Sequence, residues 1–266
     1  MCENVPYVTG LGIPPWKPDR DDAMRRKLDS TYRQEDGSRF ASLFERFGWL
    51  ARQPAAFRRE ILRLSRPCEV ARHEWVFAID DPPGGIYGVI SGGIGIEGAG
   101  PFHTVRLGHV LRTGSWFGYH PILTGGRRRV QGMRAMEDSV LLYVPLPQLR
   151  VLVESNPVAA RCIGTLANDF SILGTRVVCD LLIPKAPQRI AAVLLRVTAA
   201  EEGVEPVHPD GFQMTQAELG ELSNVSRANV NRVLGQFLEK GWISKRHQRV
   251  RVLDVPALRA FAATAA

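Results

Sequence analysis

A short segment late in the chain carries polar side chains suited to hydrogen bonding with nucleic-acid bases. Arg227, Asn229, Asn231 and Arg232 stand among apolar residues that recur at helical spacing, namely Val230, Val233, Leu234, Phe237 and Leu238. This spacing places the polar side chains on or near the face opposite the apolar one. A guanidinium group donates two parallel hydrogen bonds, which match O6 and N7 of guanine in the major groove. The segment therefore predicts a helix that is buried on one side and can bind on the other.

The residues around this segment predict two short helices joined by a tight turn, over Met214–Ile243. Thr215 and Glu218 have the spacing of a capping box, which starts a first helix that buries Leu219 and Leu222. Asn224 breaks that helix, and Ser226 caps the second. Capped helix pairs with polar outer faces are common in proteins that never contact DNA, so further features must support a helix-turn-helix reader.

Two such features follow the motif. Residues 242–253 contain two short β-branched runs around the basic turn 245–249, which includes Lys245 and Arg246, and they predict a hairpin wing. Between Arg227 and Arg251 there are seven Lys or Arg residues and one acid, Glu239, a net charge of +6. The whole chain, with 34 basic and 27 acidic residues, carries +7. Because phosphate neutralisation needs clustered cations, this concentration favours DNA binding.

The composition of the chain limits which other classes of protein it can belong to. A chain of 266 residues with 45% hydrophobic content can form about two folded domains. It has no apolar run of about 18 residues and no basic start followed by an apolar core, so we expect neither a membrane span nor a signal peptide, and a cytoplasmic location. Its four cysteines are far apart, which predicts free thiols and no zinc site.

The remaining residues change character along the chain. Residues 1–38 mix prolines and charges with little apolar periodicity and predict an irregular extension. Residues 40–64 predict two short helices with a break at Pro54. From Cys68 to Pro147, brief β-branched and aromatic runs separated by glycine indicate an antiparallel barrel or roll.

After Pro157 apolar residues recur in steps of three and four and predict a long helix that ends near Pro184. The stripe consists of Ile163, Leu166, Phe170, Leu173 and Val177. Such a seam suits a parallel coiled coil between two copies, and it equally suits a helix lying on its own barrel. Both interpretations remain open from the sequence.

A glycine-punctuated roll, a seam helix and a winged helix-turn-helix, in that order, resemble the cyclic-AMP receptor and fumarate-nitrate regulator (CRP/FNR) family of bacterial transcription factors. The resemblance covers residues 40–263. The family's recognition pattern S-R-x-x-V-x-R stands here as Ser226, Arg227, Val230 and Arg232, and the arginine that begins the family's joining helix resembles Arg189.

This resemblance implies an α+β fold with a cyclic-nucleotide-binding-like antiparallel β-roll over 39–148, a dimerisation helix over 149–186 and a winged helix-turn-helix over 187–266. It implies a homodimer on pseudo-palindromic double-stranded DNA, with RNA polymerase as a partner if the protein is an activator. Arg227 and Arg232 are expected to read bases, and Ser226, Asn229 and Gln216 to contact phosphate. Ala228 replaces a base-reading glutamate of many relatives, so we expect a different half-site.

In relatives that bind cyclic AMP, a cassette from F-G-E-L to R-S-A or R-T-A holds the cyclic phosphate and the ribose. Here Gly118 and Arg129 keep the spacing, but Tyr119 replaces the glutamate and Val130 the hydroxyl residue. The two positions that face the purine resemble Gly174 and Thr175. Because buried polar groups need partners, the sequence predicts a degenerate pocket that responds to another small effector or to none.

Alternatives remain for this pocket and for the protein class. Arg129, with Arg127 and Arg128 nearby, can bind an anion or belong to an exposed basic loop. A cyclic-nucleotide-responsive regulator is the main alternative function, and haem ligation through Cys68, His73 or His103 stays open. An iron–sulfur cluster is not expected, because Cys2 alone lies near the start of the chain.

Two further protein classes are less compatible with the residues. A metal-dependent β-roll enzyme would use His103, His109 and His120, but these lie six and eleven residues apart with no H-x-H pair, so we expect neither a metal site nor an enzyme. A nonspecific nucleic-acid or scaffolding protein would use the basic wing alone. It would show no preference among DNA sequences.

Overall fold

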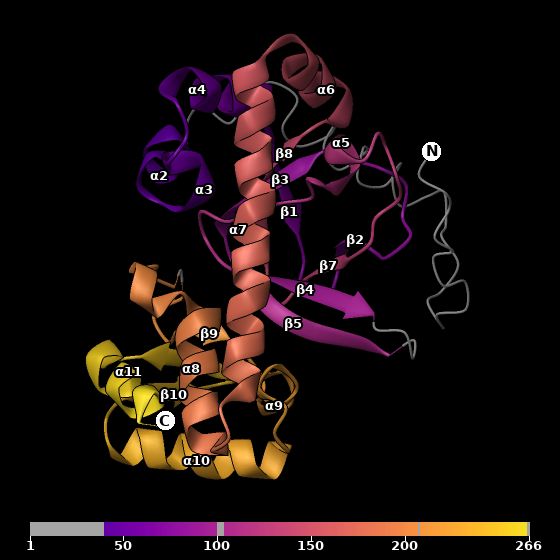
Figure 1. Cartoon of the computed structure of the whole chain (residues 1–266). Helices are drawn as coiled ribbons and strands as arrows, with labels where there is room; N and C mark the ends of the chain where they lie inside the picture. Colours follow the sequence, from indigo (N-terminus) through magenta and orange to yellow (C-terminus); the bar gives the residue numbers. More distant parts are fainter. Residues whose placement is uncertain (1–39, 100–103, 207, 265–266) are drawn as a thin grey trace.

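The computed structural model describes residues 40–99, 104–206 and 208–264. The extension predicted over 1–38, Cys2 and His103 lie outside these residues. Figure 1 shows two lobes joined by one long helix, α7 (Pro157–Leu182), with the β-roll in the upper lobe and the chain's carboxyl end in the lower one. Within the described residues, no helix has both the length and the apolar character required to cross a bilayer.

From residue 40 onward, where the description of the chain begins, three short helices precede the roll: α2 (Ala41–Arg46), α3 (Gly48–Ala51) and α4 (Ala55–Leu64). The sequence predicted two helices with one break, at Pro54. The additional break has a local cause, because Gly48 has a positive φ of 76° and its backbone lies against Gly114, where a Cβ atom would be 1.9 Å from the carbonyl oxygen. The chain therefore turns at Gly48, where α3 begins.

Two four-stranded antiparallel sheets form the roll, with the strand orders β1-β8-β3-β6 and β2-β7-β4-β5. The bounds are β1 (Arg66–Val70), β2 (Trp75–Phe77), β3 (Ile86–Ser91), β4 (Ile94–Ala99), β5 (Val105–Leu111), β6 (Trp116–Phe117), β7 (Gly132–Ala135) and β8 (Ser139–Val144). Apolar side chains such as Val89, Ile94 and Leu141 fill the space between the sheets. The predicted antiparallel roll is confirmed.

Helix α7 does not begin where the sequence analysis began its dimerisation helix. The interval 149–186 contains most of a separate helix, α6 (Leu146–Ser155), then α7 and the first residue of α8 (Ala186–Thr198). Asn156 separates α6 from α7, and its side chain accepts hydrogen bonds from the backbone N–H groups of Val158 and Ala159. The first half of α7 packs on the roll and on α3.

The lower lobe is a three-helix unit with a small sheet and a further helix. Its elements are α8, the short 3-10 helix η2 (Ala200–Glu202), β9 (Phe212–Gln213), α9 (Gln216–Ser223), α10 (Arg227–Glu239), β10 (Ile243–Arg246), β11 (Arg249–Val252) and α11 (Val255–Ala263). Its core is continuous with apolar residues of the roll, because Leu107, Val110 and Met136 join the same cluster as Leu194 and Leu219. The two lobes therefore share a packed interface.

Candidate nucleic-acid interface and effector pocket

The helix pair of the lower lobe forms as its capping residues predict. The side-chain oxygen of Thr215 accepts a hydrogen bond from the N–H of Glu218 at 3.1 Å, and the Glu218 carboxylate accepts from the N–H of Thr215 at 2.6 Å. Asn224 ends α9 in the left-handed conformation, with φ 50°. Ser226 then caps α10, so the turn between the helices is fixed by local hydrogen bonds.

Helix α10 is buried on one face and open on the other. Val230, Val233, Leu234 and Phe237 are buried in the core, whereas Leu238, predicted in the same stripe, is 39% exposed because it lies at the edge of the face. Arg227, Asn229, Asn231 and Arg232 are exposed, as is Ser226 at the cap. Neither Arg227 nor Arg232 forms an ion pair within the described part of the chain. Both guanidinium groups are available to a ligand.

A hydrogen bond connects the first turn of α9 to the exposed face of α10. The side-chain amide of Gln216 donates to the side-chain oxygen of Asn231 at 2.6 Å. This bond uses one of the two lone pairs of the Asn231 oxygen and leaves the side-chain NH2 group of Asn231 as a donor. The structure thus joins two residues that the sequence analysis assigned separately to a DNA contact.

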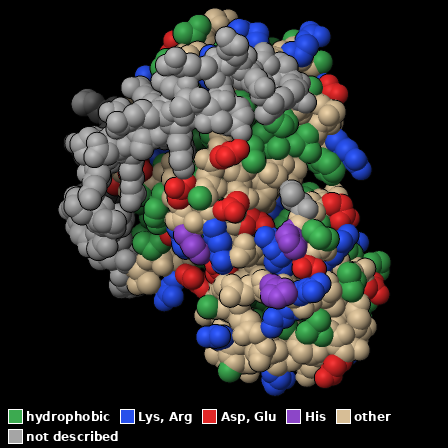
Figure 2. Space-filling model, turned by 180° about the vertical axis from the view of Figure 1, so that it is seen from behind, with side chains coloured by type: hydrophobic (Ala, Val, Ile, Leu, Met, Phe, Trp, Pro, Cys, Tyr) green, Lys and Arg blue, Asp and Glu red, His purple; other side chains and the backbone are tan. Residues whose placement is uncertain are grey.

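Strands β10 and β11 form the predicted wing next to α10. Their two-residue turn consists of His247 and Gln248, both with positive φ, at 47° and 62°. Lys245 is half-buried in β10, whereas Arg246 is exposed at the turn and lies 3.9 Å from Asp210. Figure 2 shows charged side chains of both signs gathered around the waist between the lobes on this face of the molecule.

The cassette of the roll holds its arginine in contacts with its own backbone. Arg129 is buried, and its terminal nitrogens donate to the carbonyl oxygens of Gly118 at 2.6 Å and of Gly85 at 3.0 Å. Its guanidinium also lies over the ring of Phe77, 4.0 Å from the centroid. The alternative of an exposed basic loop therefore applies to Arg127 and Arg128 but not to Arg129.

The space beside Arg129 is small and differs in its lining from the expectation. A cavity of about 100 Å³ includes Gly118, Tyr119 and Val130 in its walls, and Phe170 faces Tyr119 edge-on at 5.2 Å between ring centroids. Burial raises the pKa of Tyr119, so its hydroxyl keeps its proton. Small-molecule sites usually measure about 300 to 1,000 Å³. The cavity is well below that range.

The positions expected to face a purine are not part of this cavity. Gly174 and Thr175 lie exposed on α7, beyond the last turn that reaches the cassette. Phe170 is the residue of α7 that lines this cavity, and the purine-facing role of Gly174 and Thr175 stays a prediction. The other candidate ligands of the roll also lie apart, since no group of three or more His, Cys, Asp or Glu side chains in the described residues can hold a metal ion.

The predicted seam of α7 divides into two parts. Ile163 and Leu166 are fully buried in the chain's own core, and Phe170 and Leu173 pack partly against it. The first two residues are therefore corrected from dimer contacts to core residues, because the roll and α3 cover this face of α7. Val177 is half-buried. The exposed apolar residues of the helix lie on another face and include Ile172 and Val178.

Two protein-family models match the two lobes in sequence. A cyclic nucleotide-binding domain matches residues 67–156, and a Crp-like helix-turn-helix domain matches residues 188–261, together more than half of the chain. The chain belongs to the CRP/FNR family of transcriptional regulators. It is a DNA-binding transcription regulator of the CRP/FNR type.

Individual CRP/FNR proteins are similar over most of their length. The CRP-like cAMP-activated global transcriptional regulator of Mycobacterium tuberculosis is 26% identical over 194 residues, which cover 71% of this chain and 84% of the relative. FixK2 from Bradyrhizobium japonicum has a TM-score of 0.62 at 16% identity, covering 74% of this chain and 96% of its own. The c-di-GMP responsive regulator CLP of Xanthomonas campestris has a TM-score of 0.56 at 22% identity, with 75% and 99% covered.

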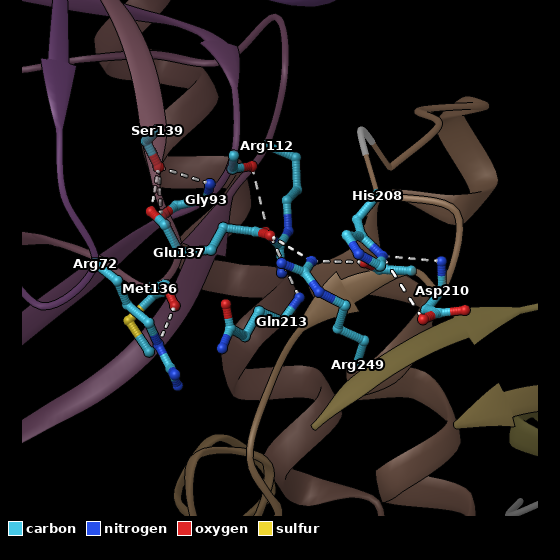
Figure 3. Close-up of polar contacts among 12 residues, drawn as sticks. Arg72, Gly93, Arg112, Met136, Glu137, Ser139, His208, Asp210, Gln213 and Arg249 are labelled. Atoms are coloured by element: carbon cyan, nitrogen blue, oxygen red, sulfur yellow. Dashed lines mark hydrogen bonds and ion pairs between the residues drawn. The ribbon is translucent and has the colours of Figure 1, made fainter. Parts of the chain in front are cut away.

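The structure of this CRP/FNR protein also contains a buried charged network that the sequence analysis did not find. The Glu137 carboxylate accepts a hydrogen bond from Arg112 at 2.5 Å and one from Arg249 of the wing at 3.1 Å (Figure 3). Arg196 of α8 donates to Asp180 of α7 at 2.6 Å and to Nδ1 of His109 at 2.8 Å. These contacts join the roll, α7 and the DNA-binding lobe.

A signal for part of this network was present in the sequence. Arg196 stands inside the apolar stripe of α8, between Val193 and Val197, and His109 stands inside an apolar strand. A charged or polar residue in a buried stripe requires a partner, although the sequence does not say which residue supplies it. Arg189, noted only for its family position, also has a joining role, since it donates to the carbonyl oxygens of Ser223 and Ile183.

Proposed function

We propose that this chain regulates transcription as a homodimer on a pseudo-palindromic DNA site, with Arg227 and Arg232 reading bases. The observation that carries the proposal is the exposed polar face of α10, whose two arginines have no ion-pair partner in the described residues. Ser226, Asn229 and Gln216 border this face, and in this proposal they contact phosphate. The adjacent wing adds Lys245 and Arg246.

Binding experiments can distinguish sequence-specific base reading from nonspecific attraction to DNA. Selection of bound sequences from random DNA should return a pseudo-palindrome whose half-sites meet successive major grooves, about 34 Å apart. Arg232→Ala should weaken binding to the selected site by about 1 to 3 kcal/mol and leave affinity for random DNA nearly unchanged. Arg63→Ala is the control, since Arg63 is an exposed arginine of α4. Equal losses on both DNAs would remove the base-reading role.

The dimer surface that we propose is the exposed face of α7 rather than the stripe read from the sequence. Ile172, Thr175, Cys179 and Leu182 follow a three-four-three spacing, and Val178 lies beside them. Ile172 and Leu182 are 53% and 72% exposed. Large apolar side chains gathered on one helix face favour burial against a second copy.

Two substitutions that each introduce a carboxylate test this surface. Val178→Glu should shift the protein from dimer to monomer in sedimentation equilibrium, because two buried carboxylates would face each other across the seam. Val151→Glu on α6 is the matched control, since Val151 is also exposed but lies off α7. A monomeric wild type, or a dimer that survives Val178→Glu, would contradict the proposed seam.

We propose further that the cassette does not respond to cyclic AMP, although a relative is named for activation by it. The supporting contacts are those of Arg129, whose terminal nitrogens already donate to Gly118 and Gly85, and Tyr119 stands where cyclic-AMP-binding relatives have a glutamate carboxylate. Calorimetry should show no micromolar binding of cyclic AMP, and changes at Tyr119 or Val130 should alter no response to it. Micromolar binding would overturn this part of the proposal.

A further inference from the structure

A side-chain hydrogen bond connects the two helices of the helix-turn-helix on their open side. The Gln216 side-chain nitrogen donates to the side-chain oxygen of Asn231 at 2.6 Å, although the two residues are 15 positions apart. Gln216 is half-buried at the first position of α9, and Asn231 is exposed in the second turn of α10. The bond therefore reaches from the start of one helix to the polar face of the other.

Other contacts already hold α9 and α10 together. Leu219 and Leu222 of α9 are buried in the same cluster as Val230 and Val233 of α10. A hydrogen bond between side chains that water can reach adds little to such packing, because water competes for both groups. The main physical effect of the bond is thus on the orientation of the Asn231 amide.

The bond selects one of two arrangements of this amide. A free asparagine can exchange the positions of its oxygen and its nitrogen by rotation about its last side-chain bond. In this chain the Asn231 oxygen accepts from Gln216, whereas the Asn231 NH2 group forms no hydrogen bond within the described residues. That group carries two N–H donors. Asn231 is therefore held as a donor toward whatever contacts the exposed face of α10.

Small residues keep the surface around Asn231 open. Ala228 stands three positions before it and Gly235 four positions after it, so both are its neighbours on the helix surface. Ala228 is exposed, and a Cβ atom at Gly235 would have nothing within 4 Å. Asparagine is short, and it reaches a base edge only when the helix backbone comes close to the DNA. Small neighbours permit this approach.

We propose that Gln216 is a positioning residue that holds Asn231 as a third base reader beside Arg227 and Arg232, an inference that rests on the proposed DNA-binding function. Asn231 donates from its NH2 group to an acceptor on a base edge in the major groove. Adenine and guanine present N7 there, guanine also presents O6, and thymine presents O4, whereas cytosine presents only its N4 amino donor. Asn231 therefore disfavours cytosine at the base that it faces.

Gln216 can serve the base contact and a phosphate contact at the same time. Its side-chain NH2 group has two N–H donors and gives one of them to Asn231. The second is available to the phosphate oxygen that the proposed function assigns to Gln216. One glutamine then ties the register of the DNA backbone to the orientation of the base-reading amide.

The donor role is tested by Asn231→Asp in the full-length protein. This substitution keeps the shape of the side chain and an oxygen that accepts from Gln216, but it replaces the NH2 group with a second acceptor. Affinities are measured for variants of the selected DNA site that differ at one base pair. At one position the preference should shift toward cytosine by about tenfold, because a carboxylate accepts from cytosine N4. Preferences at the arginine-read positions should stay the same.

The positioning role is tested by Gln216→Glu, which leaves Asn231 unchanged. A glutamate cannot donate to the Asn231 oxygen, but it accepts from the Asn231 NH2 group, so the amide turns and presents its oxygen to the DNA. The same base position should shift by about tenfold toward cytosine or adenine, whose amino groups donate. A residue that only contacts phosphate would lower the affinity for every sequence and leave this preference unchanged.

Gln248→Glu is the matched control. It makes the same change from amide to carboxylate at an exposed residue of the wing turn that is not bonded to Asn231. The added negative charge should weaken binding to the selected site and to random DNA alike, without a change in base preference. Thermal unfolding of the three variants shows whether each is folded.

The outcomes separate this inference from the proposed function. Specific binding with unchanged base preferences in Asn231→Asp and Gln216→Glu would overturn the inference and leave the proposed function standing. A shift in Asn231→Asp alone would remove the positioning role of Gln216. A wild type that already favours cytosine at the responding position would mean that the amide oxygen faces the DNA. A wild type without any sequence preference would overturn both proposals.

Discussion

Two buried arginines of the roll, Arg129 and Arg112, each line a cavity, and they use their donors differently. Arg129 gives both terminal nitrogens to carbonyl oxygens of its own cassette, and the cavity beside it is small. Arg112 reaches beyond the roll instead, since its Nε donates to the Val197 carbonyl oxygen of α8 and a terminal nitrogen pairs with Glu137, which Arg249 of the wing shares. A buried arginine can thus either hold a loop of its own domain in place or join two lobes, depending on where its acceptors lie.

The largest expected effect concerns the junction, the buried charged network through which Arg112 of the roll contacts the DNA-binding lobe. Glu137→Ala removes the carboxylate shared by Arg112 and Arg249, which leaves two largely buried guanidinium groups without it. The free energy of unfolding should fall by about 3 to 5 kcal/mol, as measured by urea denaturation. Glu205→Ala, at an exposed pair with Arg251, is the control and should cost less than about 1 kcal/mol. Similar losses in the two variants would contradict a structural role for the junction network.

A smaller effect is expected at the cassette. Arg129→Ala removes the donors that satisfy the Gly118 and Gly85 carbonyl oxygens and should lower the free energy of unfolding by about 2 kcal/mol. Its neighbour Arg128, whose side chain is 52% exposed, provides the control Arg128→Ala, with an expected cost below about 1 kcal/mol. If Arg129→Ala were neutral, the arginine would not be the element that closes the cassette.

The smallest effect concerns the pH dependence of the junction. Burial lowers the pKa of His109 well below its ordinary range, and the charges of Arg196, Arg112 and Arg176 lower it further. Below a pH of about 6.5 the unfolded chain binds a proton that the folded protein does not. The free energy of unfolding should therefore decrease by about 1 kcal/mol from pH 6.5 to 5.5.

Replacing the His109 imidazole with a side chain that does not titrate isolates its contribution to the pH dependence of unfolding. His109→Gln keeps a side-chain acceptor for Arg196 but has no titratable group, so its unfolding free energy should change less over the same pH interval than that of the wild type. The measurement is urea denaturation at several pH values. Equal slopes for the two proteins would show that His109 does not couple folding to protonation.

The DNA-binding lobe was predictable where its structure depends on neighbours in the sequence. The capping box of Thr215 and Glu218, the left-handed Asn224 and the cap at Ser226 involve residues at most three apart. These groups satisfy one another within one turn, whatever the rest of the chain does. The sequence analysis therefore placed both helices and their exposed face correctly.

The seam helix and the junction depend instead on contacts between distant residues. Helix α7 has two apolar stripes, and periodicity alone does not say that the roll covers Ile163 and Leu166 while Ile172 and Val178 stay exposed. Likewise, Glu137 and Arg249 lie 112 residues apart in the sequence. Spacing rules describe neighbours on one element, so such partners become visible only when the elements are packed.

The attachment of Arg249 to Glu137 has a consequence for how ionic strength acts on the proposed DNA complex. Each phosphate that a protein neutralises releases condensed counterions and adds about 0.9 to the slope of log affinity against log salt concentration. Arg249 belongs to the basic wing by sequence, yet its guanidinium is held by Glu137 and by the Gly211 carbonyl oxygen. Counting basic residues between Arg227 and Arg251 therefore overstates the number of counterions that each protomer can release.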